Sequence, residues 1–150
     1  MSNDVQLDLL LRMALAVVLG TVIGVERELK REEAGLRTHA LVALGASLFT
    51  IISSHAFRDL DPDPTRIAAQ IVTGIGFIGA GTILRGEAGV RGLSSAASVW
   101  AVGAMGMASG AGLPVLAVGG MLLALFVLEV LERIEQSFLR SRHIDPPAGS

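Results

Sequence analysis

The sequence predicts an all-α fold, a polytopic bundle of about five short transmembrane helices. Hydrophobic residues make up 51% of the 150 residues, and the mean hydropathy is +0.61. Only 17% of the residues are charged, whereas about a quarter are charged in a typical soluble domain. Soluble helices also show a polar face with a period of 3.6 residues, and the segments 40–52, 67–84 and 115–128 show almost none. Five such helices could not cover one another in a globule of this size, so lipid is expected to cover them.

The expected spans cover residues 7–25, 36–57, 66–84, 93–109 and 115–128, close to the ~17–25 residues that cross a bilayer. Arg12 interrupts the first span near its N-terminal, outer end, where its long side chain can reach the interface. Asp63 is expected to cap the third helix with Pro64 at the first helical position, and Ser94 to cap the fourth. Residues 85–91 are expected to form a loop and 143–150 a disordered tail, so residues 1–142 form one transmembrane domain.

The basic residues predict that the N-terminus lies outside and the C-terminus in the cytoplasm. The start of the chain lacks the basic region of a cleavable signal peptide, so the first apolar segment is expected to be a retained span. With five spans, all but three of the 12 Lys and Arg residues lie on the cytoplasmic side. The three that remain outside are Arg12, Arg58 and Arg66.

Composition excludes several functional classes. The chain has no cysteine, which excludes disulfides, thiol catalysis and thiolate metal sites. The net charge of −2 gives no basic surplus for nucleic acid. Ser95 or Ser98 together with His39 could suggest a serine hydrolase, but no nucleophile-elbow pattern is present. We therefore do not expect an enzyme.

Polar residues inside apolar segments are the candidate functional positions. Arg66, Gln70 and Thr73 are spaced at i, i+4 and i+7 and share one face of the third helix. Because lipid gives them no partners, this stripe is expected to point into the bundle, for helix–helix hydrogen bonding or for an ion or ligand path. Glu26-Arg27-Glu28 has two interpretations. It is either a solvated, salt-bridged helix end, or Glu26 turns inward to pair with Arg37 or His39.

The carboxylates offer a weak case for a divalent cation. Asp59-x-Asp61-x-Asp63 has the spacing of a calcium loop, but Pro64 and Gln70 stand where an EF-hand needs glycine and glutamate. An EF-hand is therefore rejected. The remaining alternative is that these three carboxylates weakly attract a hydrated divalent cation. Asp63 and Glu26 are the candidate metal-binding residues, Mg²⁺ is the candidate ligand or transported ion, and no other cofactor is expected.

Glycines in the third segment match the dinucleotide-binding fingerprint in spacing only. A nucleotide site needs a preceding strand and a following amphipathic helix, and both flanks here are apolar. Close helix packing, or a locally broken helix that lines a cavity, is favoured instead. The fingerprint glycines are Gly74, Gly76 and Gly79, and together with Gly81 they are the expected helix-packing glycines. The small-xxx-small spacing also occurs in the pairs Gly20/Gly24 and Gly106/Gly110.

Three blocks of sequence together resemble the MgtC/SapB family. They are GVERE followed by AGLRTHALVALGA (residues 24–28 and 34–46), DPTRIAAQIVTGIGFIGAG (63–81) and VRGLSSAASVW (90–100). The fourth-helix motif comprises Gly92, Ser94, Ser95 and Trp100, with serines where the family often has threonine or asparagine. The chain ends before the ACT-like domain of MgtC itself, so it resembles the short SapB-type members.

The resemblance implies a multi-pass protein of the bacterial inner membrane, from a family associated with magnesium limitation and, in pathogens, with survival in macrophages. We expect a regulatory or partner-binding role in magnesium homeostasis or stress adaptation. One alternative is a cation transporter or channel with Asp63, Gln70 and Thr73 on the path. Another is an inhibitor of a membrane complex such as ATP synthase. The expected partners are the lipid bilayer, further copies of the chain and another membrane protein, and not nucleic acid.

The hypothesis for the site is a polar cluster inside the membrane, with its cytoplasmic part at Glu26 and Arg37 and the remainder further out. Each charge or amide near hydrocarbon needs a partner, which is why these positions are expected to converge. The full set is Glu26, Arg27, Glu28, Arg37, Thr38, His39, Asp63, Arg66, Gln70 and Thr73.

Overall fold

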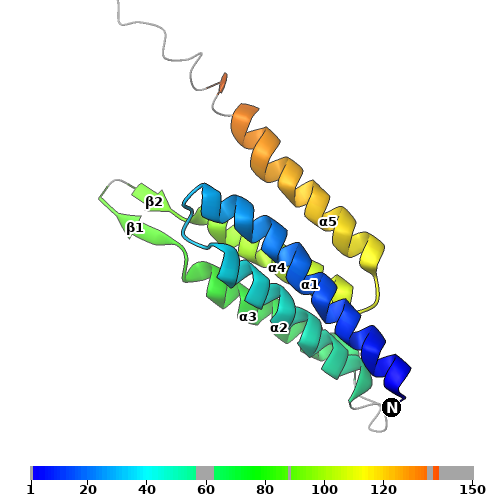
Figure 1. Cartoon of the computed structure of the whole chain (residues 1–150). Helices are drawn as coiled ribbons and strands as arrows, with labels where there is room; N and C mark the ends of the chain where they lie inside the picture. The colour runs from blue at the N-terminus through cyan, green and yellow to red at the C-terminus, as the bar shows by residue number, and fades with distance from the viewer. Residues whose placement is uncertain (1, 57–62, 88, 135–136, 139–150) are drawn as a thin grey trace, which may run out of the picture.

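Five α-helices make up most of the part of the protein that the structure describes (Figure 1). The computed structural model describes residues 2–56, 63–87, 89–134 and 137–138. The helices are α1 (Asn3–Leu29), α2 (Leu36–His55), α3 (Pro64–Ala80), α4 (Leu93–Gly110) and α5 (Pro114–Phe126), and α5 continues through a π-helical turn, η2 (Val127–Leu131). The predicted all-α bundle is confirmed, and each helix lies within a few residues of its expected span. The predicted tail at 143–150 lies outside the described residues.

Among the described residues, three helices are long and apolar enough to cross a membrane. They are Asn3–Leu29, Leu36–His55 and Pro114–Ile134, and Thr65–Ala80 is a shorter apolar helix. Large apolar side chains cover the outer surface of the bundle. Phe77 on α3 is 84% exposed and Val115 on α5 is 83% exposed. Such a surface suits contact with lipid tails and not with water.

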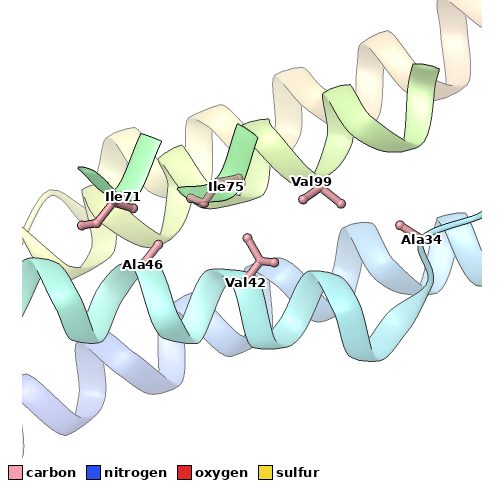
Figure 2. Close-up of a cluster of buried hydrophobic side chains, with 6 residues drawn as sticks. All are labelled: Ala34, Val42, Ala46, Ile71, Ile75 and Val99. Carbon is pink, nitrogen blue, oxygen red and sulfur yellow. The ribbon is translucent and has the colours of Figure 1, made fainter. Parts of the chain in front are cut away.

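The helices α1, α2 and α4 form the centre of the bundle, with α3 and α5 on opposite sides of it (Figure 1). One apolar cluster joins α2, α3 and α4. Figure 2 shows Val42 and Ala46 of α2 directed toward Ile71 and Ile75 of α3 and Val99 of α4. A second cluster joins α1, α2 and α4, and α5 packs on it. Its buried members are Ala16, Ile23, Ala43, Val102 and Met105.

Glycines let the three central helices approach closely. A Cβ atom on Gly20 of α1 would lie 2.6 Å from the carbonyl oxygen of His39, and one on Gly24 would lie 2.7 Å from Cα of Leu36. On α4, a Cβ on Gly110 would lie 2.5 Å from the carbonyl oxygen of Ser47, and Gly106 meets α2 in the same way. The two small-xxx-small pairs therefore hold α1 and α4 against the backbone of α2.

The segment before α4 differs from the expected loop. Leu84–Gly86 (β1) pairs antiparallel with Gly89–Arg91 (β2) in a short hairpin. The expected loop at 85–91 did not include these strands, because strands of three residues are too short to show an alternating pattern.

The caps of α3 and α4 have different outcomes. Asp63 caps α3 as predicted, and its carboxylate accepts a hydrogen bond of 2.9 Å from the backbone N–H of Thr65. The prediction of Ser94 as the cap of α4 was wrong, because α4 begins at Leu93 after Gly92. Gly92 has φ +82°, and the carbonyl oxygen of Thr82 occupies the place that a Cβ would need. Only glycine fits this position.

Candidate functional site

A buried arginine lies at the end of α1. Arg27 is 2% exposed, and its guanidinium donates to both carboxylate oxygens of Glu26, with Nη2 at 2.6 Å from Oε1. Its Nη1 lies 3.5 Å from Glu32. Arg27 follows Gly20 by seven residues and Gly24 by three, so it lies on the α1 face that packs against α2. Two carboxylates thus compensate a charge that packing has removed from solvent.

Lys30 joins the end of α1 to the end of α5. Its ammonium lies 2.8 Å from Glu26 and 3.0 Å from Glu129, and it also donates to Glu132. The carbonyl oxygen of Leu128, inside η2, lies 3.5 Å from the same nitrogen. Partial burial alone would lower the pKa of Lys30, but hydrogen bonds to the three carboxylates outweigh it and raise that pKa. Lys30 is therefore charged at neutral pH and links the ends of α1 and α5.

A histidine and two serines connect α2 and α4. His39 and Ser95 are 0% exposed and Ser98 is 4% exposed. Nδ1 of His39 lies 2.8 Å from the carbonyl oxygen of Gly35, which can only accept, so Nδ1 carries the proton. Nε2 lies 2.9 Å from Oγ of Ser98 and accepts from that hydroxyl in the neutral ring. The carbonyl oxygen of Ser95, at 3.0 Å, is a second acceptor for the same hydroxyl proton.

The turn between α1 and α2 places two carboxylates beside the start of α4. Arg31 has φ +58° at the end of α1, and the backbone N–H of Glu32 donates to the carbonyl of Arg27 at 3.1 Å. This is a Schellman ending with arginine at the position that usually holds glycine. It places Glu32 and Glu33 at 3.1 and 3.2 Å from Oγ of Ser95.

These contacts form one continuous set of polar side chains, which we call the polar network. It gathers where α1 and α5 end and where α2 and α4 begin (Figure 1). Its members are Glu26, Arg27, Lys30, Glu32, Glu33, His39, Ser95, Ser98, Glu129 and Glu132. Beyond it, toward the other end of the bundle, the core is made mostly of apolar side chains, with a few buried serines such as Ser47 and Ser109. Ala16, Ala43 and Val102 there are all 0% exposed.

Arg12 lies at the opposite end of the bundle. Its guanidinium pairs with Asp8 at 2.6 Å and lies 3.4 Å from the carbonyl oxygen of Gly110 at the end of α4. The hydroxyl of Ser109 donates to the carbonyl of Arg12 at 2.7 Å. A cation at a helix C-terminus satisfies free carbonyls and stabilises the helix dipole. Arg12 therefore fastens α1 to α4 at this end.

The expected pairing of Glu26 with Arg37 or His39 was wrong. Glu26 pairs with Arg27 and Lys30, and Arg37 is exposed. The reason is helical phase. The face of α2 that carries His39 and Val42 is buried, and Arg37 lies two residues, or about 200°, away from His39.

Two further members of the expected cluster lie at the start of α2. Thr38 is half-buried. Glu28 is exposed and caps α2, because its carboxylate accepts from the backbone N–H of Leu36 at 3.0 Å.

The expected inward stripe on α3 was also wrong. Arg66, Gln70 and Thr73 are exposed, while Ile71 and Ile75 face the core. Burying the isoleucines removes more apolar area than burying the polar stripe would, and it fixes the rotation of α3.

The four glycines of α3 do not share one role. Gly79 packs against α4, where a Cβ would lie 3.2 Å from the carbonyl oxygen of Ala96, and Gly81 caps the end of α3. A Cβ on Gly74 or Gly76 would meet no atom within 4 Å. The expectation of close packing is therefore met within this chain by Gly79 but not by Gly74 or Gly76.

Asp63 and Glu26 cannot bind one metal ion together. Asp63 follows the end of α2 and Glu26 precedes its start, so the length of α2, about 30 Å, separates them. Hydrogen bonds from the hydroxyl and the N–H of Thr65 lower the pKa of Asp63, which fits its role as a cap. The part of the chain that the structure describes contains no group of three potential metal-binding His, Asp or Glu side chains.

The fourth-helix motif is divided between core and surface. Ser95 is buried in the polar network, whereas Ser94 is exposed and Trp100 is 54% exposed.

Sequence reasoning missed Lys30, Glu129 and Glu132 as contact residues, since nothing in their spacing indicates that residues about 100 positions apart lie side by side. Arg27 could have been recognised from its phase with Gly20 and Gly24.

Comparison with known proteins identifies the family. A model described as the MgtC family matches residues 13–137. The chain belongs to the MgtC family. Together with its apolar, membrane-length helices, this membership makes it a membrane protein. No solved structure matches the chain.

Curated MgtC-family relatives are similar over most of this chain. "Putative magnesium transporter YhiD" of Escherichia coli (strain K12) is 44% identical over 133 residues, covering 85% of this chain and 62% of that protein. "Uncharacterized protein slr0014" of Synechocystis sp. is 47% identical, covering 77% and 49%. "Protein MgtC" of Brucella abortus is 50% identical over 101 residues, covering 67% and 42%. This chain therefore spans about half of the length of these relatives.

Proposed function

We propose that this protein is a multi-pass protein of the bacterial inner membrane that serves magnesium homeostasis by regulation or partner binding. Membership of the MgtC family supports the membrane setting, and one relative carries the name of a magnesium transporter. In this proposal the end that holds the polar network faces the cytoplasm. The basic residues Lys30, Arg31, Arg91 and Arg133 gather there, as the positive-inside rule requires.

The observation that carries the regulatory role is the extent of the polar network. It runs from the helix ends only as far as His39 and Ser98, and both of its cations, Arg27 and Lys30, are paired with its carboxylates. Beyond it the core side chains Ala16, Ala43 and Val102 are fully buried. Mg²⁺ loses its water reluctantly and is bound through oxygen ligands. A selective path would need such ligands through the full thickness of the bundle, and these core residues supply none.

The role proposed is not catalytic. The Ser98–His39 pair is almost fully enclosed by α2 and α4, which suits a link between helices and not attack on a substrate. The charged surface around Lys30, Glu129 and Glu132 joins the ends of α1 and α5 and suits docking of another membrane protein. An inhibitor of a membrane complex such as ATP synthase would use this same surface.

The alternative function is magnesium transport, which the name of the Escherichia coli relative favours. Its polar contacts would be Gln70 and Thr73 on the exposed face of α3. Purified protein in proteoliposomes with an entrapped magnesium-sensitive dye separates the two functions. We expect uptake equal to that of protein-free vesicles. Saturable uptake that the Gln70→Ala variant abolishes would overturn the regulatory role.

Cells test the docking role directly. We expect that the wild-type gene restores growth of a deletion strain at low magnesium, and that a charge-reversed Glu129→Lys variant, present in the membrane at equal amount, does not. Full growth of the Glu129→Lys strain would argue against docking through this surface.

A further inference from the structure

An open apolar groove runs between α2 and α3, with a volume of about 410 Å³. Its floor is made of Val42, Ala46, Ile71 and Ile75, the side chains that Figure 2 shows meeting between the two helices. Its edges carry Leu41, Gly45 and Phe49 from α2, and Gln70, Gly74 and Ile78 from α3. Three of these edge residues, two glycines and the glutamine, have no structural role within the described part of the chain.

The first unexplained feature is a pair of glycines. The glycines that face other helices, such as Gly20, Gly24 and Gly110, each leave room for a backbone that approaches within contact distance. By contrast, a Cβ on Gly45 or Gly74 would meet no atom within 4 Å. Glycine lowers helix stability by about 1 kcal/mol relative to alanine. Small residues in membrane helices permit the close approach of a neighbouring helix, and none within the described part of this chain approaches these two.

The second feature is Gln70. Its amide lies on the groove in the middle of α3, exposed at the surface of an apolar helix. Among the described residues it forms no hydrogen bond, while its neighbour Thr73 satisfies its own hydroxyl by donating to the carbonyl of Ala69 at 3.0 Å. A lipid tail offers neither a donor nor an acceptor, so the amide needs a polar partner at the same depth in the membrane.

We propose that this groove binds a second copy of the chain, with Gln70 paired to Gln70 of the partner subunit. Two copies inserted with the same orientation are related by an axis along the membrane normal, so each residue meets its equivalent at its own depth. A side-chain amide both donates and accepts, and two glutamines therefore satisfy each other across such an axis. Gly74 is one turn from Gln70 and lets the two α3 backbones come close. This self-complementarity favours a copy of the chain over a lipid chain or an unrelated helix.

The interface is independent of the function proposed above, since a dimer could either regulate or transport. It also differs from the polar network, which lies at the helix ends and not on the α2–α3 face. A negative result in the dimer tests would not affect the proposed regulatory role, and a measured magnesium flux would not contradict the interface.

Disulfide cross-linking in native membranes tests the contact, and the absence of cysteine from the sequence gives a clean background. Single variants Gln70→Cys and Gly74→Cys should form a disulfide-linked dimer under mild oxidation. The control is Leu123→Cys on α5, which is 68% exposed on another face, and it should remain monomeric. Equal cross-linking at all three positions, or none at Gln70 and Gly74, would overturn the proposal.

A matched pair of glycine variants tests the dimer without disturbing the protomer. Neither Gly74 nor Gly119 of α5 has an atom within 4 Å of the position that a Cβ would take. By native mass spectrometry in detergent, Gly74→Leu should give monomers, and Gly119→Leu should give the wild-type dimer. The Gln70→Leu variant should raise the dimer dissociation constant by about 3- to 30-fold, the range set by interhelical hydrogen bonds in membranes. A monomeric wild type, with or without bound lipid, or a Gly74→Leu dimer as stable as wild type, would contradict the interface.

Discussion

Replacing Arg27 by methionine should destabilise the protein strongly. Methionine keeps most of the volume of the side chain but removes the hydrogen bonds to both oxygens of Glu26 and the contact with Glu32. Because Arg27 is 2% exposed and the side chain of Glu26 only 15% exposed, water can replace the guanidinium beside these carboxylates only in part. Breaking a buried pair by removing one partner costs about 3–5 kcal/mol.

The remaining contacts of the carboxylates place the cost near the lower limit of that range. Glu26 still has the ammonium of Lys30 at 2.8 Å, and Glu32 still has the hydroxyl of Ser95 at 3.1 Å. We therefore expect a loss of about 3 kcal/mol, or about 100-fold in the unfolding equilibrium. The matched control is Arg37→Met, an exposed arginine one helix away, which should change stability by less than about 0.5 kcal/mol.

The assay is reversible unfolding of the purified protein in mixed micelles, by titration with a denaturing detergent. Loss of helix is followed by circular dichroism, and the single tryptophan, Trp100 on α4, gives an independent fluorescence signal. Equal stability of Arg27→Met and wild type would refute the account of Arg27 as a buried, paired charge. A larger loss of stability for Arg37→Met than for Arg27→Met would instead support the pairing of Glu26 with Arg37.

Three further predictions concern the turns and Lys30. Arg31→Gly should stabilise the protein by about 0.5–1 kcal/mol in the same titration, because arginine has φ +58° there; a destabilised variant would contradict this. Gly92→Ala should fold poorly, seen as loss of monodisperse protein in size-exclusion chromatography, because its Cβ would overlap the carbonyl of Thr82; a wild-type profile would contradict it. Lys30→Met should speed hydrogen exchange in α5. The pKa of Lys30 is raised in the fold. The stabilisation that Lys30 contributes is therefore fully present below the ordinary lysine pKa and is lost only as the pH rises beyond that pKa. The effect of Lys30→Met should thus stay constant from roughly pH 6 to 9.

The helices could be predicted because membrane insertion imposes strong local rules. Long apolar stretches located α2 and α4 to within a few residues. The Asp63-Pro64 pair located the start of α3, since both the cap and the first-turn proline act on adjacent residues. These features depend on short-range chemistry, which the sequence displays directly.

The candidate site could be predicted only in part, because its contacts join distant segments. Glu26 and His39 were correctly selected as polar positions, but the pairing of Glu26 with Arg37 or His39 was wrong. Which neighbour Glu26 contacts depends on the rotation of α1 that Gly20 and Gly24 impose. Lys30 reaches Glu132 only because α5 runs beside α1 and ends at the same side of the bundle. This tertiary relationship leaves no pattern in the spacing of the sequence.

The rotation of α3 was missed for a different reason. An isolated polar stripe was expected to face the bundle, since lipid offers no hydrogen bonds to Gln70. Within one protomer Ile71 and Ile75 take that inward position. The expectation assumed that one chain contains the whole interface, and an interface between two copies would satisfy the same rule.

Accessibility of the core at Val102 tests most directly whether a polar path crosses the bundle. A Val102→Cys variant, in a chain otherwise free of cysteine, is treated with a charged thiol reagent from each side of sealed membrane vesicles, with the exposed Ser94→Cys as the positive control. Because Val102 is fully buried between the polar network and the Arg12 end, Val102→Cys should stay unreacted from both sides while Ser94→Cys reacts. Rapid reaction of Val102→Cys from either side would mean that water and ions enter the core, and the regulatory account would be contradicted.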